Sequence, residues 1–245
     1  MNHPAFKLMI AGRRRAGTTL AQHRHHILNV HGAMVTKYIA ADPVHAPRRY
    51  AHNRVVDGSF RRSGPANDPF ALNRDFVTQI WFDNPAQAMN SLQQPFYLEH
   101  LQPDEDRFVD QASVVKLAVR EQQVSMPPNA GGNIKLFSFL TKAASIDSPA
   151  FFQAWRASSK ALAGSVNSSL RYWHVQNEVL NRPGEAAPVD AIDEFWLADR
   201  DAAAALAVAL QSAMVAPLLA AGAIADETHF ILMAEEAVLF KGNTP

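Results

Sequence analysis

Short stretches of the chain alternate apolar and polar residues, and longer stretches with helical spacing of apolar residues separate them. A period of two is typical of strands with one buried face, and apolar residues at i, i+3, i+4 and i+7 are typical of amphipathic helices. In the first half the pattern predicts strands at residues 6–13, 48–56, 76–82 and 113–124 and helices at 18–39 and 84–93. In the second half it predicts strands at 133–141, 169–180, 191–197 and 228–240 and helices at 148–164 and 199–213.

Three segments of the first half recur in the second half in the same order. The matching pairs are F-K-L-M-I-A-G from Phe6 with I-K-L-F-S-F-L from Ile134, R-Y-A-H from Arg49 with R-Y-W-H from Arg171, and D-F-V-T-Q-I-W-F from Asp75 with D-A-I-D-E-F-W-L from Asp190. Between the halves, residues 125–133 read S-M-P-P-N-A-G-G-N, a composition typical of linkers. We therefore predict a first unit at 1–125, a linker at 126–132 and a second unit at 133–245.

The order strand, helix, strand, strand, helix, strand is that of a ferredoxin-like unit, in which two helices cover one face of an antiparallel sheet. The other face is left uncovered, and two such sheets can bury these faces against each other. The predicted fold is therefore α+β, with two tandem ferredoxin-like units forming internally what a single-unit protein forms by dimerising.

Composition and charge narrow the classes of function. The 245 residues include 23 basic and 23 acidic ones, so no broad electrostatic attraction to nucleic acid or to an anionic membrane is expected. The absence of cysteine excludes disulfides, thiolate nucleophiles and cysteine metal ligands. The uncharged stretch from Ala202 to Ala225 is long enough to cross a bilayer, but its alanine content, Pro217 and Gly222 favour a soluble helix. We expect a cytoplasmic protein without a targeting signal.

Three motifs of the first half are similar to those of a known family. They are V-H-G-A-M-V at 30–35, R-R-Y-A-H-N-R-V at 48–55, and D-x-x-x-x-x-W-F, which ends at Phe82. On these motifs the chain resembles the EthD-like family of dimeric α/β barrel proteins, in a tandem duplicated form. The second half departs from the pattern, because Ser159 stands where His31 stands in the first half, although Glu194 is closer to the family than Gln79 is.

The resemblance implies a small-molecule pocket between sheet and helices that takes hydrophobic, aromatic or lactone-like substrates. It also implies that no organic cofactor is bound. We expect no metal site, because the sequence has no zinc-ligand spacing. It also has no glycine-rich phosphate-binding loop.

Candidate catalytic and substrate-binding residues lie on the first predicted helix. Helical spacing places His31, Met34, Val35 and Tyr38 on one stripe that faces the sheet. Histidine suits proton transfer near neutral pH, and a tyrosine can stabilise a developing oxygen anion. The alternative for both side chains is simple packing in the core.

The strand that follows contributes a second set of candidates. Alternation puts Tyr50, His52 and Arg54 on one face, while Arg49 points to the other. We predict a catalytic role for His52, with Tyr50 and Arg49 as substrate-binding residues. His174 follows R-Y-W in the second half as His52 follows R-Y-A, which fits either a retained catalytic role or a shared structural hydrogen bond.

Several other polar or aromatic residues have a structural interpretation. Arg49 can pair with Glu121 or Glu236 instead of a substrate. The tryptophans at 81 and 196 are expected to pack between the two sheets. We interpret the H-R-H-H run at 23–26 and the acidic residues at 104–106 as solvent-exposed.

The leading hypothesis is a cofactor-independent isomerase, cyclase or lyase acting on a hydrophobic metabolite, in which His31 moves a proton next to a carbonyl or lactone. Tyr38 or His52 would stabilise the oxygen anion. A non-catalytic protein that binds a hydrophobic ligand is the alternative, and a haem-binding or monooxygenase-type relative is a third. The sequence leaves open whether two duplicated chains associate as a homodimer.

Overall fold

A computed structural model describes residues 6–61, 68–126, 132–166, 170–181, 187–225 and 228–241. In the first half the elements are β1 (Phe6–Arg14), α1 (Leu20–His25), η1 (His26–His31), α2 (Gly32–Ala41), β2 (Arg49–Gly58), β3 (Phe76–Phe82), α3 (Pro85–Ser91), η2 (Tyr97–Leu101), α4 (Gln102–Phe108) and β4 (Val109–Ser125). In the second half they are β5 (Ile134–Leu140), α5 (Ser148–Ser165), β6 (Trp173–Val179), β7 (Ala191–Leu197), α6 (Arg200–Leu210), η3 (Gln211–Val215), α7 (Ala216–Ala220) and β8 (Phe230–Phe240). Most of the predicted linker, residues 127–131, lies outside the described residues.

The hydrogen-bonded strand order is β1-β3-β2-β8-β5-β7-β6-β4, which is that of a closed barrel, and the fold is α+β. The chain divides into two compact units. Unit 1 comprises Met1–Val55, Arg74–Glu121 and Glu236–Pro245, and unit 2 comprises Val56–Asn73 and Gln122–Glu235. The long strands β4 and β8 therefore each begin in one unit and end in the other.

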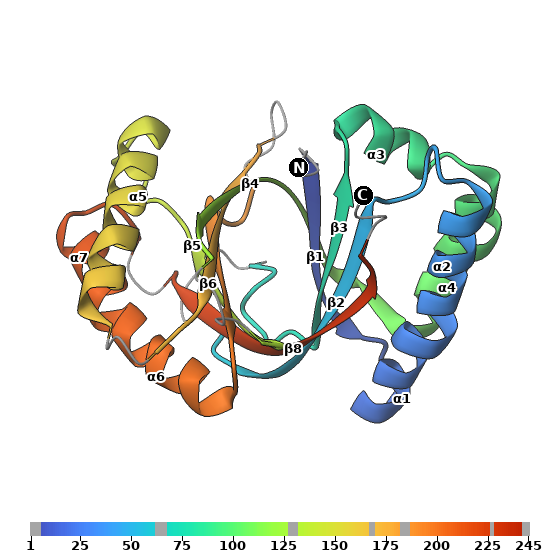
Figure 1. The fold of residues 1–245 in the computed structure, drawn as a ribbon, viewed down its shortest axis with the longest axis horizontal. Helices are drawn as coiled ribbons and strands as arrows, with labels where there is room; N and C mark the ends of the chain where they lie inside the picture. Colours follow the sequence, from blue (N-terminus) through green and yellow to red (C-terminus); the bar gives the residue numbers. More distant parts are fainter. Residues whose placement is uncertain are drawn as a thin grey trace. The chain divides into compact units, whose positions relative to one another are not determined.

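Each unit has an antiparallel sheet covered by helices. In unit 1, β3 pairs with both β1 and β2, and β4 pairs with the other edge of β1. In unit 2, β7 pairs with both β5 and β6, and β8 pairs with the other edge of β5. In Figure 1, α1, α2 and α4 lie along the strands of unit 1, and α5, α6 and α7 lie along those of unit 2.

Local sequence signals explain where the helices start. Thr19 forms a capping box with Gln22 ahead of α1, and the side chain of Asp199 accepts a hydrogen bond from the amide of Ala202 ahead of α6. The predicted helix at 18–39 is continuous from Leu20 to Ala41, but its central segment η1 has π-type hydrogen bonding.

The predicted strand 113–124 begins earlier than expected, and the helices η2 and α4 before it were not predicted. The sequence at 97–108 carries Tyr97, Leu101, Glu105 and Phe108 on one helical stripe. Pro103 and the neighbouring acidic residues resemble a loop in a one-dimensional pattern, although proline is tolerated in the first turn of a helix, where it stands in α4.

The strand register corrects the match between the R-Y-A-H and R-Y-W-H segments. Arg49 lies opposite Trp81, whereas the residue opposite Trp196 is Trp173, two positions after Arg171. His52 therefore corresponds in the sheet to Gln176, and not to His174. Because side chains alternate with a period of two, a shift of two residues leaves the hydrophobic pattern unchanged, and the sequence pattern could not detect it.

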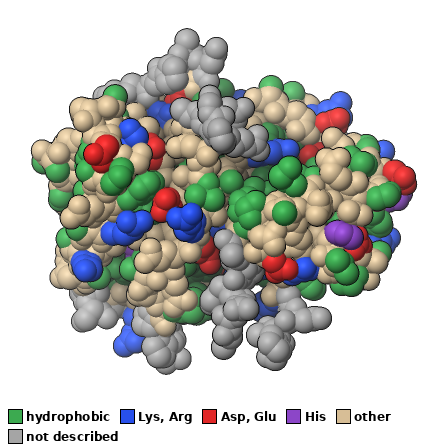
Figure 2. Space-filling model, turned by 90° about the horizontal axis from the view of Figure 1, so that it is seen from above, with side chains coloured by type: hydrophobic (Ala, Val, Ile, Leu, Met, Phe, Trp, Pro, Cys, Tyr) green, Lys and Arg blue, Asp and Glu red, His purple; other side chains and the backbone are tan. Residues whose placement is uncertain are grey.

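The helical run Arg200–Ala220 is apolar and long enough, by length and composition alone, to cross a membrane. Leu206, Leu210 and Met214 in this run are fully buried in the hydrophobic core of unit 2. A core helix can pass the same test, so the finding is weak evidence for a membrane span. On the face shown in Figure 2, acidic and basic side chains are interspersed over the coloured surface, in keeping with the zero net charge.

Candidate functional site

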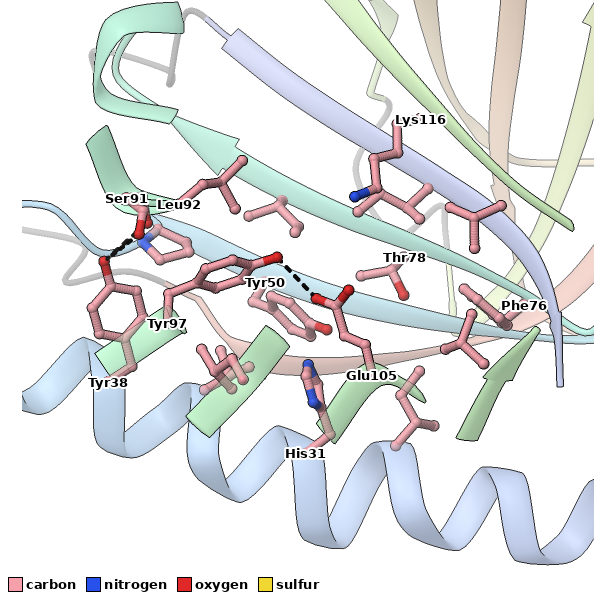
Figure 3. Close-up of a pocket in the computed structure, with 18 of the residues that line it drawn as sticks. His31, Tyr38, Tyr50, Phe76, Thr78, Ser91, Leu92, Tyr97, Glu105 and Lys116 are labelled. Carbon is pink, nitrogen blue, oxygen red and sulfur yellow. Dashed lines mark hydrogen bonds between the residues drawn. The ribbon is translucent and has the colours of Figure 1, made fainter. Parts of the chain in front are cut away.

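Unit 1 contains a cavity between its sheet and its helices. The space between these elements measures about 730 Å³, a figure that includes the solvent at its open mouth. Most of its wall is apolar, and the polar side chains in it come from helices and strands (Figure 3). The polar residues that line it are His31, Tyr38, Tyr50, Thr78, Ser91, Tyr97, Glu105, Gln111 and Lys116.

His31 lies at the end of η1, and its ring rises from the helix towards the cavity (Figure 3). Such π-type segments often occur at functional sites. Its Nδ1 donates a hydrogen bond to Oδ2 of Asp104 at 3.1 Å, which leaves Nε2 for the cavity. Burial lowers the pKa of His31, and Asp104 opposes part of that effect. The neutral ring can therefore accept a proton at Nε2 near neutral pH.

Asp104 is buried, which corrects the interpretation of residues 104–106 as a solvated acidic loop. Its carboxylate accepts hydrogen bonds from His31 and from Nε2 of His26 at 3.0 Å. Glu105 is partly buried and lines the cavity, so only Asp106 is exposed as predicted. A carboxylate that holds the far nitrogen of an imidazole fixes both its tautomer and its orientation.

Glu105 and two phenols form a second polar group in the cavity. The hydroxyl of Tyr97 donates to Oε1 of Glu105 at 3.1 Å (Figure 3). Burial raises the pKa of Glu105, although Lys116 and Tyr97 act in the opposite direction. Burial also raises the pKa of Tyr50 and of Tyr97, so both phenols keep their protons and can act as donors. The sequence analysis did not identify Tyr97, Glu105 or Lys116.

Three more of the predicted site residues line the same cavity. Val35 and Tyr50 contribute to its wall, as does Tyr38. The Tyr38 hydroxyl donates to the carbonyl oxygen of Ser91 at 3.1 Å and lies 3.1 Å from its Oγ (Figure 3). Because that proton is already used within the protein, Tyr38 is better suited to shaping the wall than to donating a proton to a ligand.

Met34, Arg49 and His52 are not among the residues that line the cavity. Met34 is only partly buried and packs against the hydrophobic cluster that includes Val35 and Tyr38. Arg49 lies over the ring of Trp81 at 4.3 Å and forms an ion pair with Glu236 at 3.6 Å, one of the two carboxylates considered from the sequence. Arg49 therefore has a structural partner in place of a ligand.

His52 is fully buried behind the cavity wall. Its Nδ1 lies 3.2 Å from the hydroxyl of Thr78, which lines the cavity and also hydrogen-bonds Tyr50. Among the residues that the structure describes, its Nε2 has no hydrogen-bond partner, and neither has Nε2 of His23, whose ring centre is 6.4 Å away. Burial lowers the pKa of His52 well below its ordinary value, so its ring is neutral near neutral pH. The ring lies behind Thr78 and Phe76, which line the cavity.

The corresponding region of unit 2 is filled by side chains. Trp155 is almost completely buried, and its indole Nε1 donates to Asp193 at 2.7 Å. Nε2 of His174 lies 2.7 Å from the other carboxylate oxygen of Asp193. Ser159, which the sequence match of the two halves places opposite His31, accepts a hydrogen bond from Gln176 at 2.7 Å. These residues satisfy one another in the core.

Within the part of the chain that the structure describes, no group of three or more His, Cys, Asp or Glu residues could hold a metal ion. The H-R-H-H run is not uniformly exposed as predicted. His23 is buried and donates from Nδ1 to the Phe108 carbonyl at 2.9 Å, His26 contacts Asp104, and His25 is exposed. Adjacent positions on a helix point in different directions, so these rings do not converge on one point.

Part of the chain matches a known family model. Residues 15–112 match the model of the EthD domain, and this segment contains the three motifs on which the chain resembles the EthD-like family. The matched segment includes His31, Asp104 and Glu105. No curated protein sequence is significantly similar to the chain.

Solved structures of dimeric α/β barrel proteins are similar to the chain over nearly its full length. A crystal structure of an anthrone oxidase-like protein has a TM-score of 0.61 at 11% identity and covers 99% of this chain and 98% of its own. Chlorite dismutase from Candidatus Nitrospira defluvii in complex with imidazole has a TM-score of 0.53 at 10% identity, covering 97% and 93%. A monooxygenase-like protein from Lactobacillus acidophilus has a TM-score of 0.52 at 9% identity, covering 97% of each chain. At these identities the likeness concerns the fold alone.

Proposed function

We propose that unit 1 is a cofactor-independent enzyme of the isomerase, cyclase or lyase type, which acts on a hydrophobic aromatic, lactone or polyketide-like metabolite. The observation that supports this most directly is the His31–Asp104 pair, which directs a neutral imidazole nitrogen towards a mostly apolar cavity. A base in such an environment is suited to remove a proton next to a carbonyl group.

In this proposal His31 accepts the proton at Nε2, and Asp104 stabilises the imidazolium that forms. The phenol of Tyr50 stabilises the negative charge that develops on the carbonyl oxygen. Tyr38, Val35 and the apolar wall surround the reacting atoms with mostly apolar side chains. His52 supports Tyr50 through the hydroxyl of Thr78, which replaces the direct catalytic role predicted from the sequence.

A non-catalytic protein that binds a hydrophobic ligand is the second candidate, because the cavity is open and mostly apolar. In that case His31 only donates or accepts a hydrogen bond, and the ligand is released unchanged. This reading predicts saturable binding without turnover.

Haem does not fit the residues that line this cavity. Its two propionate groups need cationic partners, and Lys116 is the one lysine or arginine in the described wall. Glu105 places a further carboxyl group in the same space. The proposed reaction therefore involves no haem.

We also propose that the whole chain is a tandem duplication of ferredoxin-like units, at 1–125 and 133–245, with a degenerate second unit. The matching sheet orders and the Ser159 substitution support it. A cytoplasmic location and a homodimer of the duplicated chain remain predictions.

Mass spectrometry of wild-type protein incubated with aromatic, lactone and polyketide-like compounds tests the proposed function. We expect the wild type to consume a compound that His31→Ala only binds, with a rate loss of about 10²-fold or more. His25→Ala is the matched control, because His25 is exposed on the same helical run. An unchanged rate in a folded His31→Ala variant contradicts the proposed function, and equal binding without turnover by both proteins supports the binding protein.

A further inference from the structure

Glu105 is a second ionisable side chain in the cavity, and the proposed reaction of His31 leaves it without a role. It lies on α4 directly after Asp104, but the two carboxyl groups have different surroundings. Asp104 accepts from His31 and His26, whereas Glu105 lines the cavity and accepts a hydrogen bond from Tyr97. Figure 3 shows the Glu105 carboxyl group and the His31 ring facing the same space.

The remaining polar groups of the wall are less suited to exchange protons with a ligand. Tyr38 is engaged with Ser91. Burial raises the pKa of Tyr50 and of Tyr97, so their phenols stay protonated and act as hydrogen-bond donors. His31 and Glu105 are therefore the two groups in this wall that combine access to the cavity with an ordinary pKa below neutrality.

We propose that Glu105 is a second catalytic residue, which transfers a proton to a carbon atom of the substrate different from the one that His31 deprotonates. A hydrophobic substrate that needs a proton removed at one carbon and added at another is a cyclic β,γ-unsaturated ketone, whose double bond moves into conjugation with the carbonyl group, and we assign this class to the cavity. This inference rests on the proposed function and narrows it to a 1,3-proton shift.

The steps balance without any oxidant or reductant. His31 Nε2 removes a proton from the α-carbon, the C–H electron pair forms a new C=C bond, and the carbonyl electrons move onto oxygen, where the Tyr50 hydroxyl stabilises the dienolate. The oxygen electrons then return, and the γ-carbon takes the proton of the Glu105 carboxyl group. Transfer of the proton from the imidazolium to the Glu105 carboxylate restores both residues.

The surroundings of the two groups suit this exchange. Burial lowers the pKa of His31 and raises the pKa of Glu105, so the two values approach each other from their ordinary positions. Both shifts favour the neutral imidazole and the protonated carboxyl group, which are the forms in which the reaction begins.

Proton NMR in heavy water with the non-conjugated cyclohexenone as the probe tests the inference. Two processes are followed with the full-length protein: deuterium exchange at the α-carbon and formation of the conjugated ketone. Glu105→Gln keeps the size of the side chain and removes its proton transfer. Glu99→Gln is the matched control, because Glu99 is exposed on η2, and far-UV circular dichroism and urea unfolding verify that each variant folds.

We expect Glu105→Gln to retain α-carbon exchange and to lose isomerisation by about 10²-fold or more, while Glu105→Asp recovers part of it and Glu99→Gln matches the wild type. Isomerisation by folded Glu105→Gln at the wild-type rate overturns the inference and leaves the role of His31 intact. Loss of exchange together with isomerisation also overturns it, since Glu105 would then act in the first step. Absence of both exchange and isomerisation in the wild type overturns this inference, whereas the proposed function is overturned only if the aromatic, lactone and polyketide-like compounds also remain unchanged.

Discussion

The burial of Asp104 predicts a large cost for removing its carboxyl group. Its side chain is 4% exposed and accepts hydrogen bonds from His31, whose side chain is 8% exposed, and from His26, which is 23% exposed. In Asp104→Ala, water can reach the freed donor of His26 more easily than the freed donor of His31. The His31 Nδ1–H group therefore carries most of the cost.

The magnitude follows from these two donors. A buried donor left without a partner costs about 1–3 kcal/mol, and an ordinary hydrogen bond contributes about 0.5–1.5 kcal/mol. We expect Asp104→Ala to lower the free energy of unfolding by about 2–4 kcal/mol. Asp104→Asn should cost less, because the amide oxygen can still accept one hydrogen bond from an imidazole.

Urea unfolding at neutral pH, followed by far-UV circular dichroism, measures this cost. Asp106→Ala is the control, since Asp106 is exposed on the same helix and should change the free energy of unfolding by less than about 0.5 kcal/mol. A double-mutant cycle with His31→Leu isolates the pair, because replacing both partners leaves no orphaned group between them. An Asp104→Ala variant as stable as the wild type, or strict additivity in the cycle, would refute the reasoning.

Two further predictions concern stability. Because burial lowers the folded-state pKa of His23, His31 and His52, and that of His229 to about 4, these four histidines bind more protons in the unfolded chain than in the folded chain below about pH 6.5. The contribution of these histidines to the free energy of unfolding should therefore be greatest above that pH and fall on acidification. His229 alone should lower the free energy of unfolding by about 3 kcal/mol at pH 4. Urea midpoints that do not change between pH 7 and pH 4.5 would contradict this prediction. Trp155→Ala should lower the free energy of unfolding by about 3–5 kcal/mol in the same assay, because Trp155 is buried in the core of unit 2 and its indole nitrogen donates to Asp193. A decrease below about 1 kcal/mol would contradict this prediction and show that neighbouring side chains fill the gap.

The sequence pattern predicted the elements well where one face of a strand or helix is buried. Every predicted strand begins and ends within four residues of an observed strand. Alternation of side chains between the two faces with a period of two marks strands such as β4 and β8, in which burial also alternates. The same property limits alignment of the two halves. A register shift of two residues keeps every side chain on the same face of the strand, so the pattern could not reject the alignment based on R-Y-x-H. The strand pairing instead aligns Asn53 with Asn177.

The cavity was predicted in part for a related reason. His31, Val35 and Tyr38 were found because helical spacing places them on one stripe of a continuous helix. His52 and Arg49 were placed by alternation on a strand, which tells which face a side chain is on but not whether a neighbouring ring covers it. Phe76 lies against His52, with ring centres 5.8 Å apart, and lines the cavity itself.

Asp104 and Glu105 show which part of a site a linear pattern does not specify. The two residues are adjacent and acidic and directly follow Pro103 in the first turn of α4, and an exposed loop has the same composition. Adjacent positions on a helix point about 100° apart, so once α4 packs beside η1 one carboxyl group contacts His31 and the other turns to the cavity. The distinction between a residue that orients the base and a residue that faces the ligand thus arises from the packing of two helices 73 residues apart in sequence. Only the aromatic and apolar stripe of Tyr97, Leu101 and Phe108 could have indicated it in advance, by predicting the helix that separates these two directions.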